Sequence, residues 1–430
     1  MDNYKRHLSD LIPSEAREQA ICSEAEGRDR ISLPAAVDLR RWGKPFSPLN
    51  FQEKIIEGIK GLIDYGPVKG LLALPTGSGK TLTTCRLVLE ALCHSSSKKK
   101  NVIWLAPQRE LLYQASEAFQ AAWWAGIGPP SLDIRIVKSK ASFSVSSRPT
   151  CWLMTPKMAE GLLRPIQSSC DIAIFDEAHH TAADVFLEIW SAVSQGDEVI
   201  LALGLSATPS RENGNELPIL QDAFSHNLFL PRLLGANPIE TLINDGVLAR
   251  PVFCLMEDIP LYSKHKGHKD QRAIRNLVVD DKRWQCVVNC LCHKRTGKVV
   301  VYAFDKLHGR FLTRHLRYLG EKAEFVDGDT PLAVRNGIFE RFRNGDTRIL
   351  VNVKLLIEGV DCPAAESVLL TYPTQAQIRL HQMVGRVLRG PKIGGTPEGK
   401  VFAMEGSQQW LDRILFRGDY RFAGWNVKEL

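Results

Sequence analysis

An eight-residue stretch, Leu74-Pro-Thr-Gly-Ser-Gly-Lys-Thr81, constrains this chain more than any other part of its sequence. Its glycines allow the backbone to curl so that N–H groups face a phosphate, its lysine supplies a point charge, and its final hydroxyl can ligate Mg²⁺. The common pattern G-x-x-x-x-G-K-[ST] begins with a glycine, and Leu74 stands at that position here. The stretch therefore predicts a nucleoside-triphosphate loop of a less common kind.

A second motif, Asp176-Glu177-Ala178-His179, follows the apolar run Ile172–Phe175. An apolar run of this length that ends in carboxylates predicts a buried strand with acidic residues at its carboxyl end. We expect Asp176 to hold the same Mg²⁺ ion as Thr81, from the opposite side. The two motifs together predict a nucleoside-triphosphate and Mg²⁺ site.

Composition leaves room for more than one domain. The chain has 430 residues, 44% of them hydrophobic, which is enough for roughly two to three packed cores. Its net charge of +7 permits a polyanionic partner without requiring one. Ten scattered cysteines and the absence of an apolar signal segment favour a reducing, cytoplasmic compartment. We expect Cys286, Cys290 and Cys292 to pack as small hydrophobes rather than to bind zinc, and no apolar run is long enough to suggest a membrane partner.

Short apolar runs alternate with helix-like segments twice, which predicts an α/β protein with two parallel sheets covered by helices. The strands expected in the first half are 70–74, 101–106, 133–137, 150–154, 171–175 and 198–203, and the clearest helices are 81–93 and 109–122. The strands expected in the second half are 298–304, 322–326, 347–353, 366–371 and 399–403. The predicted divisions are an N-terminal accessory segment (1–45), a first domain (46–212), a linker with an insertion (213–282), a second domain (283–405) and a C-terminal tail (406–430).

Ligand-binding residues of an open parallel sheet gather at the carboxyl ends of its strands. Expected strands of the first half are followed there by polar motifs, namely Pro75–Thr81, Pro107-Gln-Arg109-Glu-Leu, Thr155-Pro156, Asp176–His179 and Ser206-Ala-Thr-Pro209. In order and content these resemble motifs I, Ia, Ib, II and III of the superfamily-2 DEAD/DEAH-box helicases and translocases. The resemblance implies two tandem RecA-like domains with an ATP cleft between them.

The second half continues the resemblance. Ile349–Asp361 resembles motif V, and Gln382-Met-Val-Gly-Arg386-Val-Leu-Arg389 resembles motif VI in its Q-x-x-G-R-x-x-R form. Arginines delivered across a cleft stabilise a phosphoryl group in transfer only when two lobes close, which would tie hydrolysis to domain movement. The stretch Val326-Asp-Gly-Asp-Thr-Pro331 resembles the bacterial RadD-like DNA helicases, with XPB-like proteins and restriction motors as wider relatives.

The resemblance implies a role for each matching residue. Lys80 would bind the β and γ phosphates of ATP, and Thr81 and Asp176 would hold Mg²⁺. Glu177 would polarise the attacking water as general base. Gln382 would help to place that water. The γ phosphate would be met by Arg386 and Arg389, and the remaining nucleotide contacts would come from Gln52, Thr76, Gly77, Ser78, Gly79, Gly359 and Asp361.

Coupling and nucleic-acid contacts are implied in the same way. Ser206, Ala207 and Thr208 would link the nucleotide state to the strand-binding surface, with a simple turn ahead of Pro209 as the alternative. Contacts in this family go mostly to phosphates and sugars, and the residues expected to make them are Arg109, Thr155, Lys157, Thr330 and Lys354. For Arg109, a pair with Glu110 or a helix cap is the alternative.

The sequence therefore predicts an ATP-dependent helicase or translocase that moves along or remodels DNA, single-stranded or forked, in DNA repair, recombination or phage defence. The family default is 3′ to 5′ movement. An RNA-directed motor is one alternative, because the core motifs do not touch bases. The other alternative is an ATP-gated binding subunit of a larger complex, in which residues 1–45 dock a protein partner.

Overall fold

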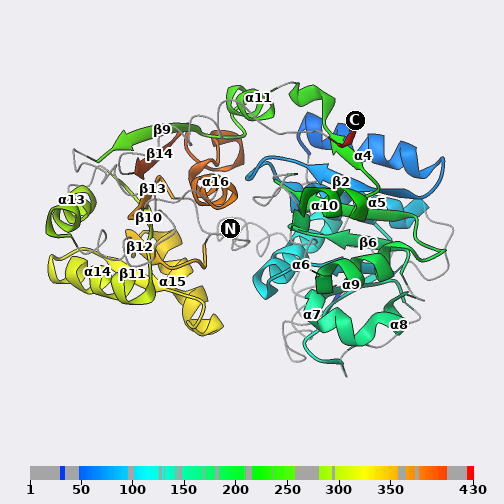
Figure 1. The fold of residues 1–430 in the computed structure, drawn as a ribbon, viewed down its shortest axis with the longest axis horizontal. Coiled ribbons are helices and arrows are strands. Elements are labelled where there is room, and N and C mark those ends of the chain that lie inside the picture. Colours follow the sequence, from blue (N-terminus) through cyan, green and yellow to red (C-terminus); the bar gives the residue numbers. More distant parts are fainter. Residues whose placement is uncertain are drawn as a thin grey trace. The chain divides into compact units, whose positions relative to one another are not determined.

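Two sheets organise the chain, as its two series of apolar runs predict (Figure 1). The computed structural model describes residues 30–33, 48–94, 101–124, 128–129, 131–140, 143, 148–167, 170–179, 184–207, 209, 216–235, 237–256, 280–292, 296–356, 365–372, 377–403 and 424–430. The chain divides into two compact units, of which the first covers 1–74, 79–233 and 420–430 and the second covers 75–78 and 234–419.

The first sheet places its described strands in the order β1-β4-β5-β3-β6-β7-β2-β8-β15. Neighbouring strands run parallel except β1 and β4, which are antiparallel. Most are buried on both faces, which is why they read as continuous apolar runs. Their bounds are β1 Arg30–Leu33, β2 Val68–Ala73, β3 Val102–Leu105, β4 Leu132–Ile136, β5 Thr150–Met154, β6 Ile172–Phe175, β7 Leu201–Ser206, β8 Asn227–Leu230 and β15 Asn426–Glu429.

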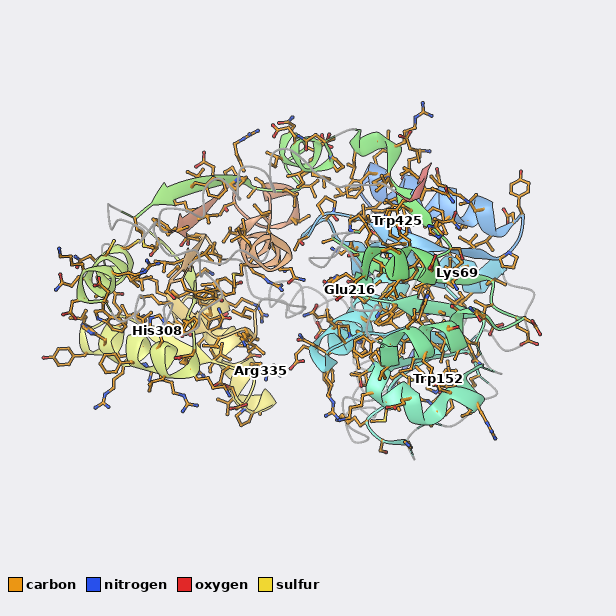
Figure 2. All side chains as sticks on the ribbon, in the orientation of Figure 1. Lys69, Trp152, Glu216, His308, Arg335 and Trp425 are labelled. Carbon is orange, nitrogen blue, oxygen red and sulfur yellow. The ribbon has the colours of Figure 1, made fainter. Side chains whose placement is uncertain are left out.

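Helices cover this sheet and bury apolar stripes against it. In α4, Phe51, Ile55, Ile56 and Ile59 recur every three to four residues and are buried, as helical periodicity requires. The core beneath the helices is rich in aromatic residues, including Trp152 (Figure 2) and Trp190. The helices are α4 Asn50–Ile63, α5 Lys80–His94, α6 Arg109–Trp124, α7 Pro156–Ala159, η3 Glu160–Leu162, α8 Leu163–Gln167, α9 Asp184–Ser194, α10 Leu217–Ala223 and η6 Arg232–Leu234.

The second sheet is parallel between all neighbours and has the order β11-β12-β10-β13-β14-β9. Its strands are β9 Arg250–Leu255, β10 Val299–Tyr302, β11 Ala323–Val326, β12 Ile349–Asn352, β13 Ser367–Leu370 and β14 Glu398–Ala403. The helices of this unit are α11 Pro238–Asn244, α13 Asp281–Cys292, α14 Lys306–Tyr318, α15 Leu332–Asn344, α16 Gln377–Val384, η7 Gly385–Val387 and η8 Pro391–Ile393. In α13, Cys286, Cys290 and Cys292 pack partly buried against the apolar core of this unit.

Each expected strand is present within one to three residues of its predicted bounds, and the predicted α/β class with two tandem RecA-like units is confirmed. Four strands were not predicted. β1 lies within 1–45, the predicted accessory segment, and pairs with β4 of the first sheet. β8 and β9 lie within 213–282, the predicted linker and insertion, and they extend the first and second sheets respectively. β15 lies within the predicted tail and joins the first sheet beside β8.

Among the residues that the structure describes, none of the helices has the length and apolarity needed to cross a membrane.

Candidate active site

The glycine-rich loop joins β2 to α5 at the carboxyl end of the first sheet. Gly77 and Gly79 have φ angles of 86° and 85°, in the left-handed region that favours glycine. The Ser78 hydroxyl donates to the Pro75 carbonyl at 2.7 Å and closes the turn. Lys80 opens α5, whose first N–H groups have no partners within the helix and favour an anion. The loop geometry therefore fits a phosphate group.

Two oxygens that could hold a metal converge beside this loop. The Thr81 hydroxyl donates to Oδ2 of Asp176 at 3.3 Å. β6 delivers Asp176 beside β3, where the Asp176 N–H donates to the Leu105 carbonyl at 2.8 Å. Mg²⁺ is usually held in nucleotide sites by one or two protein oxygens together with substrate phosphates and water. The hydroxyl and the carboxylate fit such an ion.

The electrostatics of Asp176 also fit a cation. The side chain is buried, and burial together with the neighbouring Glu177 carboxylate raises the pKa of Asp176 to about 7, although Lys80 opposes the change. A buried carboxylate with a raised pKa is held at a cost to the fold when it is charged. A divalent cation at this position would offset that cost.

Glu177 occupies a strained position next to Asp176. Its φ of 51° is unusual for a residue other than glycine, and such strain is often retained at functional positions. Its N–H donates to Oδ1 of Asp176 at 3.0 Å. Its Oε2 is buried, forms no hydrogen bond within the described chain, and lies 3.4 Å from Nδ1 of His179. A carboxylate oxygen that accepts no hydrogen bond from the protein can take a proton from water, as the predicted general base must.

A histidine joins this carboxylate to the next motif. Nδ1 of His179 lies 3.3 Å from the Ser206 hydroxyl at the end of β7. The Ser206 carbonyl in turn accepts the N–H of Leu74, the residue before the glycine-rich loop. The predicted coupling residue Ser206 is thus connected to both the acidic motif and the loop. Ala207 is buried and Thr208 lies outside the described residues.

His179 belonged to the predicted acidic motif, but its contacts could not be assigned from sequence. They depend on β6 and β7 being neighbours in the sheet.

Gln52 lies against the same loop. Its side chain is buried, and its Oε1 accepts the N–H of Leu49 at 2.9 Å, which helps to fix the start of α4. A Cβ placed on Gly79 would lie only 2.7 Å from Nε2 of Gln52, so the amide packs directly against the loop. The amide is therefore held beside the nucleotide loop, and nucleotide binding by Gln52 stays a prediction.

The second unit carries Gln382 of motif VI on α16 and Arg386 on η7, and Arg389 follows η7. Nε of Arg386 donates to the carbonyl of Leu356 at 2.9 Å, and the Tyr302 hydroxyl lies 3.1 Å from the same oxygen. Oδ1 of Asn352 accepts the Leu356 N–H at 3.2 Å. Motifs V and VI are thereby joined through one peptide unit. Tyr302 and Asn352 were not predicted as site residues, because each simply ends an apolar strand.

The backbone around Arg389 is fixed from two sides. Arg389 forms a β-bridge with Leu248, and its carbonyl accepts the N–H of Thr396 at 3.0 Å. Gln382 is buried on α16. Gly359 and Asp361, which were predicted to bind nucleotide, lie outside the described residues.

Three of the predicted nucleic-acid contacts lie at one edge of the first sheet. Arg109 is exposed and opens α6 after β3, whereas Thr155 and exposed Lys157 follow β5. β3 and β5 are neighbours, so these residues share the carboxyl edge of the sheet.

The other two predicted contacts lie in the second unit. Lys354 is exposed and has a strained φ of 60° directly after β12. The Thr330 hydroxyl donates to Oδ1 of Asp327 at 2.9 Å and accepts the Asp327 N–H, so a nucleic acid would have to compete with these bonds. Nη2 of Arg335 (Figure 2) donates to the Thr330 carbonyl and holds the same turn.

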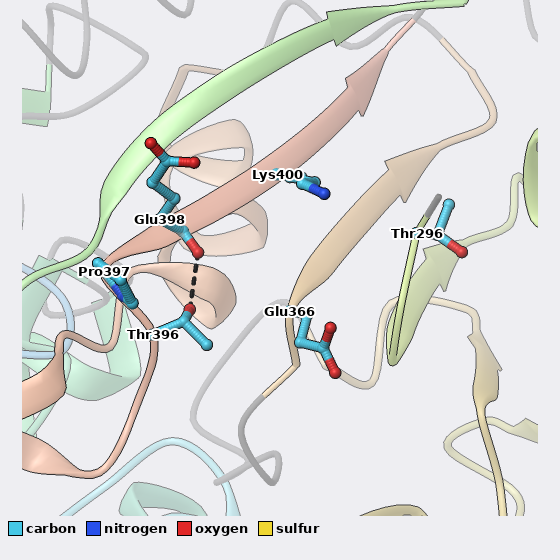
Figure 3. Close-up of a pocket in the computed structure, with 6 residues that line it drawn as sticks. All are labelled: Thr296, Glu366, Thr396, Pro397, Glu398 and Lys400. Carbon is cyan, nitrogen blue, oxygen red and sulfur yellow. Dashed lines mark hydrogen bonds between the residues drawn. The ribbon is translucent and has the colours of Figure 1, made fainter. Parts of the chain in front are cut away.

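An open pocket of ≈ 260 Å³ lies elsewhere on the second unit (Figure 3). Glu366 precedes β13, Glu398 begins β14 and Thr296 precedes β10, so the pocket faces the amino ends of these strands. Motif V begins with β12 and continues beyond the carboxyl end of that strand. The pocket is therefore separate from the predicted nucleotide-binding residues.

Two family models match the sequence. Residues 45–211 match the type III restriction enzyme res subunit, and residues 282–391 match the helicase conserved C-terminal domain. The chain belongs to helicase superfamily 2, and the first of its two matching regions is similar to the restriction enzyme subunit. Its predicted place in the RadD-like group of that superfamily stays a prediction.

One curated relative and two solved structures illustrate the similarity. The putative ATP-dependent helicase IRC3 of Saccharomyces cerevisiae is 25% identical over 353 residues, which cover 79% of this chain and 49% of the relative. The structure of the helicase Lhr of Mycobacterium smegmatis, bound to ssDNA and AMP-PNP, matches with a TM-score of 0.61 at 17% identity. The match covers 87% of this chain and 48% of the Lhr chain. A fragment of a putative HsdR subunit of a type I restriction enzyme from Vibrio vulnificus matches with a TM-score of 0.61 at 18% identity. This match covers 91% of this chain and 70% of the fragment. The two structures bear on the fold alone, and the chain spans about half the length of the yeast relative.

Proposed function

We propose that this chain is an ATP-driven motor that hydrolyses ATP with Mg²⁺ to move along or remodel DNA. The observation that carries the proposal is the convergence of Thr81, Asp176 and Glu177 beside the glycine-rich loop. A phosphate cradle, a metal-binding oxygen pair and a carboxylate without a hydrogen-bond donor are the groups that ATP hydrolysis requires. Membership of superfamily 2 supports the same conclusion.

The residues of the first unit divide the chemistry between them. The N–H groups of the loop and Lys80 bind and orient the phosphates. Bound Mg²⁺ would supply charge neutralisation at the phosphate oxygens. Glu177 takes the proton of the attacking water, since its Oε2 is buried without a donor. His179 holds the same carboxylate near Ser206, so that a change at the nucleotide is transmitted to Ser206.

The second unit supplies the positive charge that the transferred phosphoryl group needs. The Arg386 side chain is bonded to the Leu356 carbonyl of motif V, which the Tyr302 hydroxyl also contacts, and Arg389 follows three residues later in the chain. We propose that these arginines approach the γ phosphate when ATP is bound. Hydrolysis then requires movement of one unit relative to the other, which is the basis of translocation.

DNA is the proposed track. The restriction enzyme family that matches the first half of the chain supports this choice, and the exposed Arg109 and Lys157 at one sheet edge suit phosphate contacts that tolerate any sequence. RNA remains the alternative track, since phosphate contacts do not distinguish the two sugars. DNA repair, recombination or phage defence, in the cytoplasm, is the setting that we propose.

The test is the steady-state ATPase rate of the purified chain alone and with single-stranded DNA, forked DNA or matching RNA, at one stated salt concentration. We expect DNA to stimulate the rate well above RNA. Stimulation led by RNA would transfer the proposal to an RNA motor. An ATPase rate that neither DNA nor RNA raises above the basal rate would contradict the motor assignment. It would favour an ATP-gated subunit that needs a partner.

A further inference from the structure

The C-terminal residues of the chain return to the first sheet. β15 pairs in parallel with β8, and β8 pairs with β2, the strand that leads into the glycine-rich loop (Figure 1). The preceding described strand, β14, belongs to the second sheet. The chain therefore passes from the first unit to the second and back again, and its final strand belongs to the sheet whose β2 leads into the nucleotide loop.

Trp425 brings this C-terminal strand into contact with the coupling motif. Its indole is buried in the apolar core of the first unit, together with Leu71 of β2 and Leu228 of β8 (Figure 2). Its Nε1–H donates to the carbonyl of Pro209 at 3.2 Å. Pro209 closes the Ser206-Ala-Thr-Pro209 motif. The indole thus fixes the end of the motif that lies away from β7.

The other end of the same motif reaches the catalytic glutamate. The Ser206 hydroxyl lies 3.3 Å from Nδ1 of His179, and this nitrogen lies 3.4 Å from Oε2 of Glu177. The four-residue motif is therefore held by the acidic motif at its start and by Trp425 at its end. A shift of Pro209 would reach Ser206 along the chain and then Glu177 through the contacts of the His179 side chain.

β15 begins directly after Trp425 and is anchored at both ends. At its start, Nδ1 of His226 lies 3.0 Å from the carbonyl of Gly424, and the Asn426 N–H donates to the His226 carbonyl at 2.7 Å. After it, the Leu430 N–H donates to the carbonyl of Leu230 at 2.8 Å.

Two residues of this anchor have a strained backbone. Ser225 and His226 have φ angles of 55° and 57°, which residues other than glycine rarely adopt. Among the described residues, Glu177 and Lys354 also have positive φ angles, and both are predicted site residues. Strain of this kind persists where the surrounding structure enforces it and is often associated with function.

We propose that Trp425 is a positioning residue of the motor, which holds the Pro209 end of the coupling motif so that nucleic-acid binding is transmitted to Glu177. The proposal rests on the proposed motor function. It assigns a role in coupling to the C-terminal strand, whereas the family motifs all lie upstream of it. Trp425 acts on the reaction through Pro209 and Ser206, without itself contacting the nucleotide.

The test is Trp425→Phe, which keeps an aromatic ring in the core and removes the single N–H donor. Trp190→Phe is the matched control, because Trp190 is buried in the same core and its Nε1–H donates to the Ala223 carbonyl at 2.8 Å, away from the coupling motif. Two measurements are compared: the amide hydrogen exchange of peptides that cover Leu201–Pro209, and the kcat and KM of the ATPase with and without DNA. Thermal unfolding of both variants checks that their stabilities are lowered equally.

We expect faster exchange over Leu201–Pro209 in Trp425→Phe alone, and a stimulated kcat lowered about three- to tenfold, the factor for one ordinary hydrogen bond, at unchanged KM for ATP. Equal behaviour of the two variants in both measurements would overturn the proposal. If DNA does not stimulate the wild-type ATPase, the motor function itself fails. In that case unchanged exchange in Trp425→Phe overturns the positioning role as well, and faster exchange retains it.

Discussion

Asp176→Asn gives the sharpest test of the electrostatics at the nucleotide site. Burial and the Glu177 carboxylate raise the pKa of Asp176 from 3.8 to about 7. Each pKa unit corresponds to about 1.4 kcal/mol, so a charged Asp176 costs the folded state up to about 4 kcal/mol at pH 8 without Mg²⁺. The amide oxygen keeps the acceptor for the Glu177 N–H, and the amide NH₂ group can donate to the Thr81 hydroxyl oxygen in place of the lost acceptor. We therefore expect Asp176→Asn to be more stable than the wild type at pH 8.

The pH dependence fixes the sign of this effect. The folded-state pKa of Asp176 lies above its unfolded value, so the folded wild type binds an extra proton between about pH 4 and 7. Its stability then falls as pH rises through that window, and the difference from Asp176→Asn grows from near zero at pH 4 to its full value above pH 7. Mg²⁺ at pH 8 should raise the stability of the wild type and leave the variant unchanged, because only the carboxylate binds the ion strongly.

The assay is chemical unfolding followed by tryptophan fluorescence, which reports on the first unit through Trp104, Trp152 and Trp190 and on the second unit, which holds Glu324, through Trp284. Glu324→Gln is the control of opposite sign. Burial alone would raise the pKa of Glu324, but hydrogen bonds from Arg341 and Thr347 hold it below its usual value. This variant should therefore be less stable than the wild type at neutral pH, with a difference that disappears on acidification. Equal or lower stability of Asp176→Asn at pH 8 without Mg²⁺ would refute the reasoning.

Three further changes test other parts of the site. Glu177→Gln should retain ATP binding and lower turnover by about 10² or more, measured by nucleotide-binding fluorescence and ATPase assay, and near-normal turnover would exclude Glu177 as the base. Arg389→Ala should lose turnover at nearly unchanged nucleotide affinity, and weakened affinity with normal kcat would assign it a binding role instead. The Gly424 carbonyl and the Asp222 carboxylate each accept a hydrogen bond from the His226 ring and raise its pKa. Only the imidazolium, with two N–H donors, can satisfy both acceptors. The anchor of β15 is therefore complete at low pH and weakens as pH rises through the raised pKa of His226. Hydrogen exchange over residues 424–430, corrected for its intrinsic pH dependence, should show that loss in the wild type and not in His226→Gln.

The central strands of both sheets could be predicted because they are buried on both faces. Val102–Leu105 and Ile172–Phe175 are entirely buried, so each reads as an unbroken apolar run that ends where its polar motif begins. The glycine-rich loop could be predicted because its backbone conformation needs glycine at Gly77 and Gly79. Both features depend on local sequence alone.

The contacts that link the motifs could not be predicted, since they depend on which strands become neighbours. β15 reads Asn-Val-Lys-Glu and is exposed along its whole length, so only its pairing with β8 makes it a strand. The contact of His179 with Ser206 follows from the pairing of β6 with β7. Trp425 reaches Pro209 across a separation of 216 residues, and no short motif signals such a bond.

ATP-dependent displacement of a labelled strand from a triplex on duplex DNA, or of streptavidin from the end of a biotinylated single strand, tests movement along DNA directly. The wild-type chain should displace the label with ATP and Mg²⁺, whereas Glu177→Gln and a non-hydrolysable ATP analogue should give no displacement despite bound nucleotide and DNA. Hydrolysis of ATP by the wild type with no displacement on any DNA or RNA track would contradict the assignment of this chain as a motor.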